Sequence, residues 1–388
     1  MKIGMVVQRY GTDVVGGAES LCRGVAEALA RRGHEIEVLT SCARSYRTWA
    51  NHYREGSERL HGVTVRRFRA LGERDVDAFN AISEQLFADP DRSGDDEVAW
   101  VDAQGPLVRG LVDHLHAAGR DYAHLLFFTY LYYPTVHGIH AAPERSVLVP
   151  TAHDEAPFWL ETYRAVFELP RALIFNTRAE QELVERRFPA LARPTTVAGV
   201  GIDSLDDLVA AAEQSTPPTL PTVLYAGRIE EGKGTGELIE WLRRFRSESG
   251  VDAQLWLMGE AAMDLPDEAW IEALGYVSEE EKRRRLAAAT VLAAPSALES
   301  FGIVLMEANA AGTPVLANAQ SAAYVELCRA GNGGLFYDGY AEFAASLQLL
   351  LSDAALRHTL ADAGRDYALT TYSWDAVADR YEALLASL

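Results

Sequence analysis

Short apolar runs alternate with amphipathic stretches along this chain. The first run, Ile3–Val7, leads into a glycine-containing loop, Gly11–Gly17, and then into an amphipathic stretch from about Ala18 to Arg32. This pattern predicts a buried strand, a loop and a helix, and it predicts the next strand at His34–Thr40. Because a helix joins the two strands, the order is typical of a parallel, doubly wound sheet.

The same order continues through both halves of the chain. In the first half, four more strands and a helix are predicted at Val63–Phe68, Leu125–Phe128, Ser146–Pro150, Ala172–Asn176 and, for the helix, Arg178–Arg187. In the second half, strands are predicted at Thr222–Ala226, Ala253–Met258, Val291–Ala294 and Pro314–Ala317. Helices are predicted between them at Glu237–Arg246, Glu279–Ala288 and Ile303–Ala311. Each half therefore indicates a Rossmann-like α/β domain.

The length of 388 residues also favours two domains, because it exceeds the usual size of a single hydrophobic core. The segment Asp203–Pro221 is polar and ends in Ser-Thr-Pro-Pro-Thr-Leu-Pro, so we expect an exposed connection and a hinge there. A last helix is predicted over Asp375–Leu388, with Ser373 as its N-cap. Its apolar face is expected to contain Trp374, Val377, Tyr381 and Leu384.

The net charge of −20 disfavours nucleic acid and anionic membranes as partners. Two short basic runs, Arg66–Arg69 and Arg283–Arg285, could form local patches, but a solvated face beside acidic neighbours is the simpler interpretation of both. The oligomeric state is left open by the sequence.

No stretch reaches the roughly 18 apolar residues that a membrane helix requires, and the first apolar run is too brief for a signal peptide. We therefore expect a cytoplasmic protein without stable membrane insertion. The three cysteines, Cys22, Cys42 and Cys328, are odd in number and widely spaced, which indicates neither a disulfide framework nor a zinc site, so buried thiols are expected.

Two glutamates, Glu299 and Glu307, stand eight positions apart around Phe301-Gly302, where a loop is predicted to open into a helix. A helix N-terminus offers free backbone N–H groups and a positive partial charge, which suit phosphate, while a carboxylate on either side suits sugar hydroxyls. The pattern indicates a clamp for a sugar nucleotide. Alternatively, Glu299 is a helix cap and Glu307 an exposed helix residue; against this, the apolar run Ile303–Ala311 would bury Glu307.

The loop Gly227–Gly234 follows a predicted strand, at the end where open parallel sheets bind ligands. Arg228 and Lys233 are spaced so that their cationic heads can converge, and Gly232 and Gly234 allow sharp turns. Such a loop suits a pyrophosphate leaving group, on which negative charge grows. The P-loop pattern is absent, and a solvated turn is the alternative interpretation.

Two further candidates lie in the first half. Gly16 and Gly17 precede a helix and can present backbone N–H groups, but they do not fit the dinucleotide fingerprint, which disfavours a nicotinamide oxidoreductase. His153 follows a predicted strand, and Asp154 could orient it; a single histidine is more often structural than catalytic.

Together these motifs resemble the retaining glycosyltransferases of family 4, which have the GT-B architecture. The resemblance runs from Ile3 to the C-terminus and is strongest between Ala226 and Pro314. It implies two Rossmann-like doubly wound domains facing a central cleft. The first, residues 1–203, would be completed by the C-terminal helix 374–388 and take the acceptor; the second, residues 204–373, would bind the nucleotide sugar.

The resemblance also implies roles for residues that match the family motifs. Arg228 and Lys233 would hold the pyrophosphate, Glu307 the ribose and Glu299 the donor sugar. The remaining implied donor contacts are the backbone N–H groups of Phe301, Gly302 and Ile303 and, along the nucleobase, Tyr276 and Val277.

In the first domain, the loop with Gly16 and Gly17 would lie beneath the donor phosphate and beside the acceptor. His153 would hydrogen-bond the transferred sugar or its phosphate without acting as a general base. Two segments depart from the family pattern: Gly199-Val200 stands where Pro-Asn is usual, and Gly259–Ala262 where Gly-Asp/Glu-Gly-Pro is frequent.

The implied reaction is retaining transfer of a hexosyl group, with a UDP-sugar as the first choice of donor and GDP-mannose as the second. No metal or other cofactor is expected, because two cations and a helix end can neutralise the leaving group and no Asp-x-Asp pair lies beside the donor motifs. The acceptor is expected to be a hydroxyl-bearing sugar or small molecule; aromatic side chains in Phe127–Tyr133 and Phe158-Trp159 are candidates for stacking on it. A nucleotide-sugar epimerase and a non-catalytic sugar-nucleotide-binding subunit are the alternatives.

Overall fold

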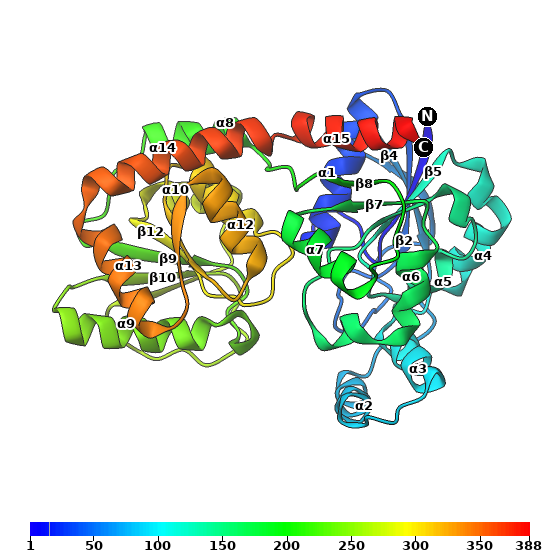
Figure 1. Cartoon of the computed structure of the whole chain (residues 1–388), viewed down its shortest axis with the longest axis horizontal. Helices are drawn as coiled ribbons and strands as arrows, with labels where there is room; N and C mark the ends of the chain where they lie inside the picture. The colour runs from blue at the N-terminus through cyan, green and yellow to red at the C-terminus, as the bar shows by residue number, and fades with distance from the viewer. Residues whose placement is uncertain (15) are drawn as a thin grey trace. The chain divides into compact units, whose positions relative to one another are not determined.

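A computed structural model of the chain describes residues 1–14 and 16–388. These residues form two compact units, each built around one β-sheet (Figure 1). The first unit contains Met1–Gly201 and Val377–Leu388, and the second contains Ile202–Ala376. The sequence places the corresponding divisions after Asp203 and before Trp374.

The first unit has an eight-stranded sheet in the order β3-β4-β2-β1-β5-β6-β7-β8, parallel throughout except that β3 runs antiparallel to β4. Its strands are β1 (Lys2–Val6), β2 (Glu35–Ser41), β3 (Gly56–Leu60), β4 (Val63–Phe68), β5 (His124–Phe128), β6 (Ser146–Val149), β7 (Ala172–Phe175) and β8 (Thr195–Val197). The strand order reverses between β1 and β5, so the loops that follow these two strands flank the switch point of the sheet.

Helices cover this sheet because their apolar residues recur every three or four positions. In α1, for example, Leu21, Val25 and Leu29 are buried on one face. The helices of the unit are α1 (Gly17–Arg31), α2 (Val76–Ala88), α3 (Gly94–Gln104), α4 (Arg109–Ala118), α5 (Tyr133–Gly138), α6 (Arg164–Glu168) and α7 (Arg178–Arg187), together with most of α15 (Trp374–Ser387).

The C-terminal helix α15 is tied to the first unit by packing and by ion pairs. Ser373 accepts a hydrogen bond from the Ala376 N–H (3.2 Å), which confirms it as the N-cap. Tyr381 is buried, and Glu382 forms ion pairs with Arg32 (2.6 Å) and His34 (2.7 Å) at the end of α1. This helix therefore supplies part of the core of the first unit.

The second unit has a six-stranded parallel sheet in the order β11-β10-β9-β12-β13-β14. Its strands are β9 (Thr222–Ala226), β10 (Gln254–Met258), β11 (Ile271–Gly275), β12 (Val291–Ala294), β13 (Val315–Asn318) and β14 (Gly334–Tyr337). Its helices are α8 (Leu205–Glu213), α9 (Thr235–Ser249), α10 (Glu279–Ala288), α11 (Ile303–Ala310), α12 (Ala322–Gly331), α13 (Tyr340–Ser352) and α14 (Ala354–Thr371). Helix α9 lies on one side of this sheet and α10 and α14 on the other (Figure 1). The order reverses between β9 and β12, as in a doubly wound dinucleotide-binding sheet.

The prediction of a simple exposed connection over Asp203–Pro221 is wrong. Helix α8 occupies Leu205–Glu213, and its Leu208 is buried. The helix forms because six of its nine residues are alanine, leucine or valine, with two aspartates in its first turn. Only the Pro-rich end of the segment remains without regular structure.

Histidines whose pKa values are lowered in the folded state make the stability of the first unit depend on pH. Burial, with nearby Arg171 and Arg145, lowers the pKa of His124 below its usual 6.5. Partial desolvation also lowers the pKa values of His114 and His140, which are less deeply placed. The unfolded chain then binds protons more readily than the folded chain. The contribution of these histidines to stability is therefore fully present above about pH 6.5 and is lost as the pH falls.

We therefore expect the urea concentration at the unfolding midpoint to decrease when the pH is lowered from about 7 to about 5. His124→Gln should make this decrease smaller. Urea unfolding followed by circular dichroism at several pH values measures it. His61→Gln, at a side chain that is 57% exposed, is the control. An unchanged pH dependence in His124→Gln contradicts the assignment.

Candidate active site

The predicted donor residues lie in loops that leave one edge of the second unit's sheet. Arg228 and Lys233 follow β9, Tyr276 follows β11, and Glu299 follows β12. Because all six strands are parallel, these loops share the carboxyl edge, and β9 and β12 are neighbours at the switch point. Open α/β sheets bind ligands at this position.

The loop after β9 packs directly against the loop after β12. Gly234 has φ of 72° and begins α9, and a Cβ atom there would lie 2.7 Å from the carbonyl oxygen of Pro295. Glycine is therefore required at this position by both conformation and space. Gly232, in contrast, has open space around it and no positive φ, so the sharp turn expected of both glycines belongs to Gly234 alone.

Lys233 and Glu299 meet across this contact. The Lys233 ammonium lies 2.7 Å from Glu299 Oε1, and the two side chains are 29% and 25% exposed. Arg228 pairs instead with Glu230 at 3.2 Å, so the two cations expected to converge have separate carboxylate partners in this structure. The pair Lys233–Glu299 joins the phosphate-binding candidate to the sugar-binding candidate.

Helix α11 begins at Ile303, with Gly302 as its N-cap and no side-chain hydrogen bond to its first turn, so Glu299 does not cap it. Gly302 has φ of 116°, and a Cβ atom there would lie 2.6 Å from the Tyr324 ring. Phe301 is buried and packs edge-on against Tyr372, with ring centroids 5.0 Å apart. The N-terminus of α11 therefore offers backbone N–H groups beside Glu299, as the sequence predicts.

Glu307 is only 8% exposed, so its alternative interpretation as an exposed helix residue is wrong. Its Oε1 lies 2.6 Å from the ammonium of Lys282, which also lies 3.7 Å from Glu279. Burial lowers the pKa of Lys282. Attraction to Glu307 and the hydrogen bond between the two side chains raise it by more than burial lowers it, so the pKa lies above its usual value. The buried carboxylate is thus paired with a cation.

Sequence reasoning missed Lys282 because the pair joins two different helices, α10 and α11. A signal was present: the chain has only three lysines, and a carboxylate in an apolar run requires a partner.

The loop after β10 is held against the loop after β9. A Cβ atom on Gly259 would overlap the carbonyl oxygen of Gly227, and the Ile229 N–H donates to Glu260 O (3.0 Å). The segment Gly259–Ala262, which departs from the family pattern, thus keeps the glycine that this packing requires. Tyr276, the nucleobase candidate, is 76% exposed, and Val277 is partly exposed.

In the first unit, the glycine loop covers a buried ion pair. Gly16 is the N-cap of α1, and a Cβ atom there would overlap the carboxylate of Glu19. Arg9 Nε donates to Glu19 Oε1 (2.8 Å), and both side chains are buried. Gly17 has open space around it, while Val15 of the predicted loop lies outside the described residues.

His153 follows β6 and lies beside Glu155, not Asp154. Its Nε2 is 3.4 Å from Glu155 Oε2, and Glu155 Oε1 accepts a hydrogen bond from the Tyr130 hydroxyl (2.7 Å). Asp154 accepts from the indole N–H of Trp159 (2.8 Å), so the suggestion that it orients His153 is wrong.

The loops after β5 and β6 begin with strained residues. Thr129 and Thr151 have φ of 64° and 50°, values that threonine rarely adopts. Such strain is common at functional sites.

The aromatic candidates for acceptor stacking belong mostly to the hydrophobic core. Phe127, Phe128, Tyr130 and Phe158 are buried. Trp159 is 43% exposed and remains the candidate among them.

The basic runs form ion pairs, as their simpler interpretation predicts. Arg66 pairs with Glu37 and Arg67 with Glu58, while Arg285 pairs with Glu272. Arg67, however, is buried and not solvated.

Among residues 1–14 and 16–388, no group of three or more histidine, cysteine, aspartate or glutamate side chains could hold a metal ion. Within the same residues, no helix has both the length and the apolar character needed to cross a bilayer. The three cysteines are buried free thiols, which confirms the prediction.

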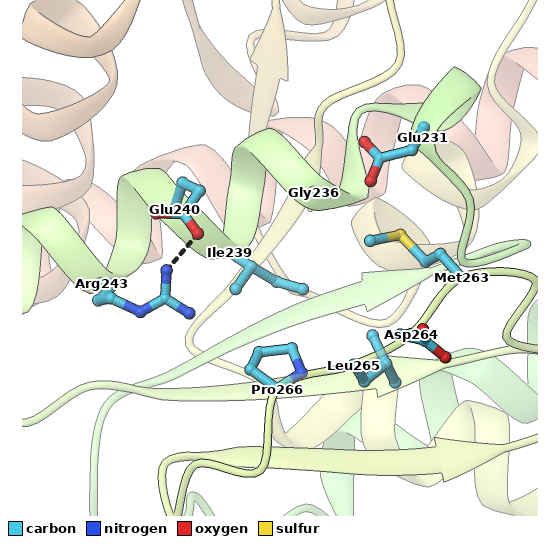
Figure 2. Close-up of a pocket in the computed structure, with 9 residues that line it drawn as sticks. All are labelled: Glu231, Gly236, Ile239, Glu240, Arg243, Met263, Asp264, Leu265 and Pro266. Atoms are coloured by element: carbon cyan, nitrogen blue, oxygen red, sulfur yellow. Dashed lines mark hydrogen bonds and ion pairs between the residues drawn. The ribbon is translucent and has the colours of Figure 1, made fainter.

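A pocket on the α9 side of the second unit is separate from the predicted donor residues. Figure 2 shows it between α9 and the segment Met263–Pro266, with Glu231 at one end and Arg243, paired with Glu240, at the other.

Comparison with known proteins agrees with this architecture. The family described as glycosyl transferases group 1 matches residues 210–367. The D-inositol 3-phosphate glycosyltransferase of Xylanimonas cellulosilytica is 31% identical over an alignment that covers 95% of this chain and 91% of that protein. Two solved structures share the fold over the full length of both chains: sucrose-phosphate synthase from Thermosynechococcus elongatus (TM-score 0.71, 20% identity) and Anabaena HepE in complex with UDP and glucose (TM-score 0.70, 20% identity). The GT-B expectation of two Rossmann-like parallel-sheet units is confirmed.

The buried pair Lys282–Glu307 yields a stability prediction. We expect Lys282→Met to destabilise the chain by about 3 kcal/mol, because it leaves Glu307 buried without its cation, and Lys282→Met/Glu307→Leu to recover most of the loss. Urea unfolding at pH 7 measures both variants.

A matched control is Arg244→Met, at an exposed pair with Glu248 on α9, which should change the stability much less because water screens the pair. If Lys282→Met costs no more than this control, the pair does not neutralise a buried charge.

Proposed function

The chain belongs to the glycosyl transferases group 1 family, and on this premise we propose that it moves a hexosyl group from a nucleotide-diphosphate sugar to an acceptor hydroxyl with retention of configuration. The observation that carries the proposal is the contact of Lys233 with Glu299 at the switch point, beside the uncapped N-terminus of α11. A cation, a carboxylate and free backbone N–H groups are the groups that a sugar diphosphate requires.

We propose that Lys233 and Arg228 bind the diphosphate, with the N–H groups of Phe301, Gly302 and Ile303 beside them. When Lys233 turns to the phosphate, Glu299 is released to accept hydrogen bonds from hydroxyls of the sugar. The ion pair between them is partly exposed, so exchanging its partners costs little.

Glu307 is proposed to accept hydrogen bonds from the ribose through the oxygen that Lys282 does not contact. Lys282 keeps this carboxylate in place, since the pair is buried. Tyr276 and Val277 are proposed to lie along the base, where an exposed ring after β11 can stack on it.

In the proposed step, the bond from the sugar C1 to the diphosphate oxygen breaks and the acceptor oxygen bonds to C1 on the same face. The leaving phosphate takes the proton of the acceptor hydroxyl, so no protein nucleophile is required. Charge stabilisation by Arg228 and Lys233 then supplies most of the catalysis. His153, positioned by Glu155, is proposed to hydrogen-bond the transferred sugar or its phosphate, and Gly16 and Gly17 to present backbone to the same ligand.

A UDP-sugar is the proposed donor, and GDP-mannose is the second choice. The HepE structure, which contains UDP and glucose, supports this order. A sugar-containing or small hydroxyl compound is the proposed acceptor.

Nucleotide binding tests the donor site. In a thermal-shift panel of uridine, guanosine, thymidine and adenosine diphosphates and their sugars, we expect one nucleotide at 100 times its Kd to add about 2.7 kcal/mol to stability. Lys233→Ala should abolish the shift and Lys2→Ala, at the start of β1, should keep it. A shift that survives in Lys233→Ala places the diphosphate elsewhere.

Turnover tests the reaction. With the nucleotide sugar found by binding and a panel of sugar acceptors, we expect transfer to continue in EDTA and the product to keep the donor's anomeric configuration, followed by proton NMR. Loss of activity that magnesium restores contradicts metal independence, and an inverted product contradicts retention. Epimerised donor formed without acceptor would indicate an epimerase.

A further inference from the structure

The segment from Cys42 to Arg74 is basic in an acidic protein. It carries eight arginines against three glutamates, with no aspartate or lysine, and hence a net charge of +5, whereas the whole chain carries −20. Its two loops follow β2 and β4, so they leave the carboxyl edge of the first unit's sheet, as the loop with Gly16 and Gly17 does after β1. A local field of opposite sign thus lies at the edge where open sheets bind ligands.

Half of these arginines already have partners. Arg66 and Arg67 pair with Glu37 and Glu58, Arg59 donates to Gly62 O, and Arg74 donates to backbone carbonyls. The other four are exposed and make up what we term the basic surface: Arg44, Arg47, Arg54 and Arg69. Within the described residues, only Arg44 of these four has a carboxylate at ion-pair distance, Asp13 at 3.4 Å.

The loops that carry the basic surface are joined and held rigidly. The Cys42 N–H donates to Phe68 O (2.8 Å), and Asn51 exchanges two hydrogen bonds of 2.9 Å with the backbone of Ala70. Strand β3 pairs antiparallel with β4, with Gly56 opposite Arg67, so Arg54 shortly precedes β3 at the same end of the pair at which Arg69 follows β4. The four arginines are therefore carried by neighbouring loops that backbone and side-chain hydrogen bonds hold together.

Arg74 holds the loop after β2 in place through hydrogen bonds to its backbone. Its Nε donates to Arg47 O (2.9 Å), its Nη1 to the Gln104 side chain (2.9 Å), and its Nη2 to Tyr46 O. All of these acceptors are uncharged, so Arg74 holds the loop without reducing the positive charge of the surface.

The basic surface also adjoins the glycine loop. Arg9 donates through Nη1 to Arg44 O (2.8 Å) and through Nε to Glu19, whose carboxylate fills the space beside Gly16. Asp13, the partner of Arg44, belongs to the glycine loop itself. An acceptor bound beside Gly16 would thus have arginines within its reach.

We propose that Arg44, Arg47, Arg54 and Arg69 bind an anionic group, a phosphate or a carboxylate, carried by the acceptor. The inference rests on the proposed function, in which the first unit takes the acceptor. Guanidinium groups bind both anions bidentately, and three of these four exposed arginines, Arg47, Arg54 and Arg69, have no carboxylate at ion-pair distance within the described residues. The rest of the acidic chain repels such an acceptor, so the surface also directs it to this edge.

Isothermal titration of the full chain with inorganic phosphate, glucose 6-phosphate, glucuronate and glucose tests the proposal. Saturating uridine diphosphate is present throughout, so that the donor's phosphate site is filled. We expect at least one of the three anions to bind about tenfold or more tightly than glucose, and Arg44→Gln/Arg69→Gln to remove that advantage. Arg120→Gln, at an exposed arginine before β5, should leave it unchanged.

The proposal is wrong if none of the three anions binds more tightly than glucose, or if the double variant binds them as the unsubstituted chain does. Co-sedimentation with phosphatidylglycerol vesicles that depends on the same arginines, without binding of the soluble anions, would assign the surface to a membrane and also overturn it. Binding of uridine diphosphate is measured separately: if it persists in the arginine variant and is lost in Lys233→Ala, a failure of anion binding concerns the acceptor alone.

Discussion

Backbone packs against backbone where the loops after β9, β10 and β12 leave the second sheet, and the arrangement of the proposed donor site depends on these contacts. Gly234 lies against Pro295, and Gly259 lies against Gly227. Neither position has room for a side chain, so the loops approach more closely than any other residue would allow. This closeness lets Lys233, from one side of the switch point, reach Glu299 on the other.

The two lysine–glutamate pairs of this site differ in burial, and the difference separates the roles proposed for them. The pair Lys233–Glu299 is partly hydrated and loses little when a ligand takes over either partner. The pair Lys282–Glu307 is more deeply buried, and breaking it leaves a charge in a poorly hydrated position. The site thus combines an exchangeable ion pair, where charge develops in the proposed reaction, with a permanent one that fixes geometry.

The sequence predicted those features that depend on local patterns. Apolar runs located most of the strands, although β8, β11 and β14 were not predicted, and the apolar surroundings of Glu307 predicted its burial. Both kinds of feature are properties of a short window. The antiparallel strand β3 has no such pattern, since its residues Gly56–Leu60 are almost all exposed, and no prediction covered it. Helix α8 was hidden because the prolines that follow it dominate the composition of its segment.

The partners of the site residues could not be read from local patterns. Lys282 and Glu307 are on different helices. Glu155, and not the adjacent Asp154, lies beside His153, because the loop after β6 turns Asp154 towards Trp159. The run Arg66–Arg69 shows the same limit. Alternate residues of strand β4 point to opposite faces, so Arg66 and Arg67 acquire different partners while Arg69, beyond the strand, stays exposed.

Helix α15 has a consequence for the order in which the chain can fold during synthesis. The first unit needs Val377–Leu388 for its core and for the ion pairs at the end of α1, whereas the second unit lies wholly between the two parts of the first. A ribosome therefore completes the second unit before it releases the residues that finish the first. The usual order, in which the N-terminal domain matures first, is reversed, and the incomplete first unit must wait with part of its apolar surface uncovered.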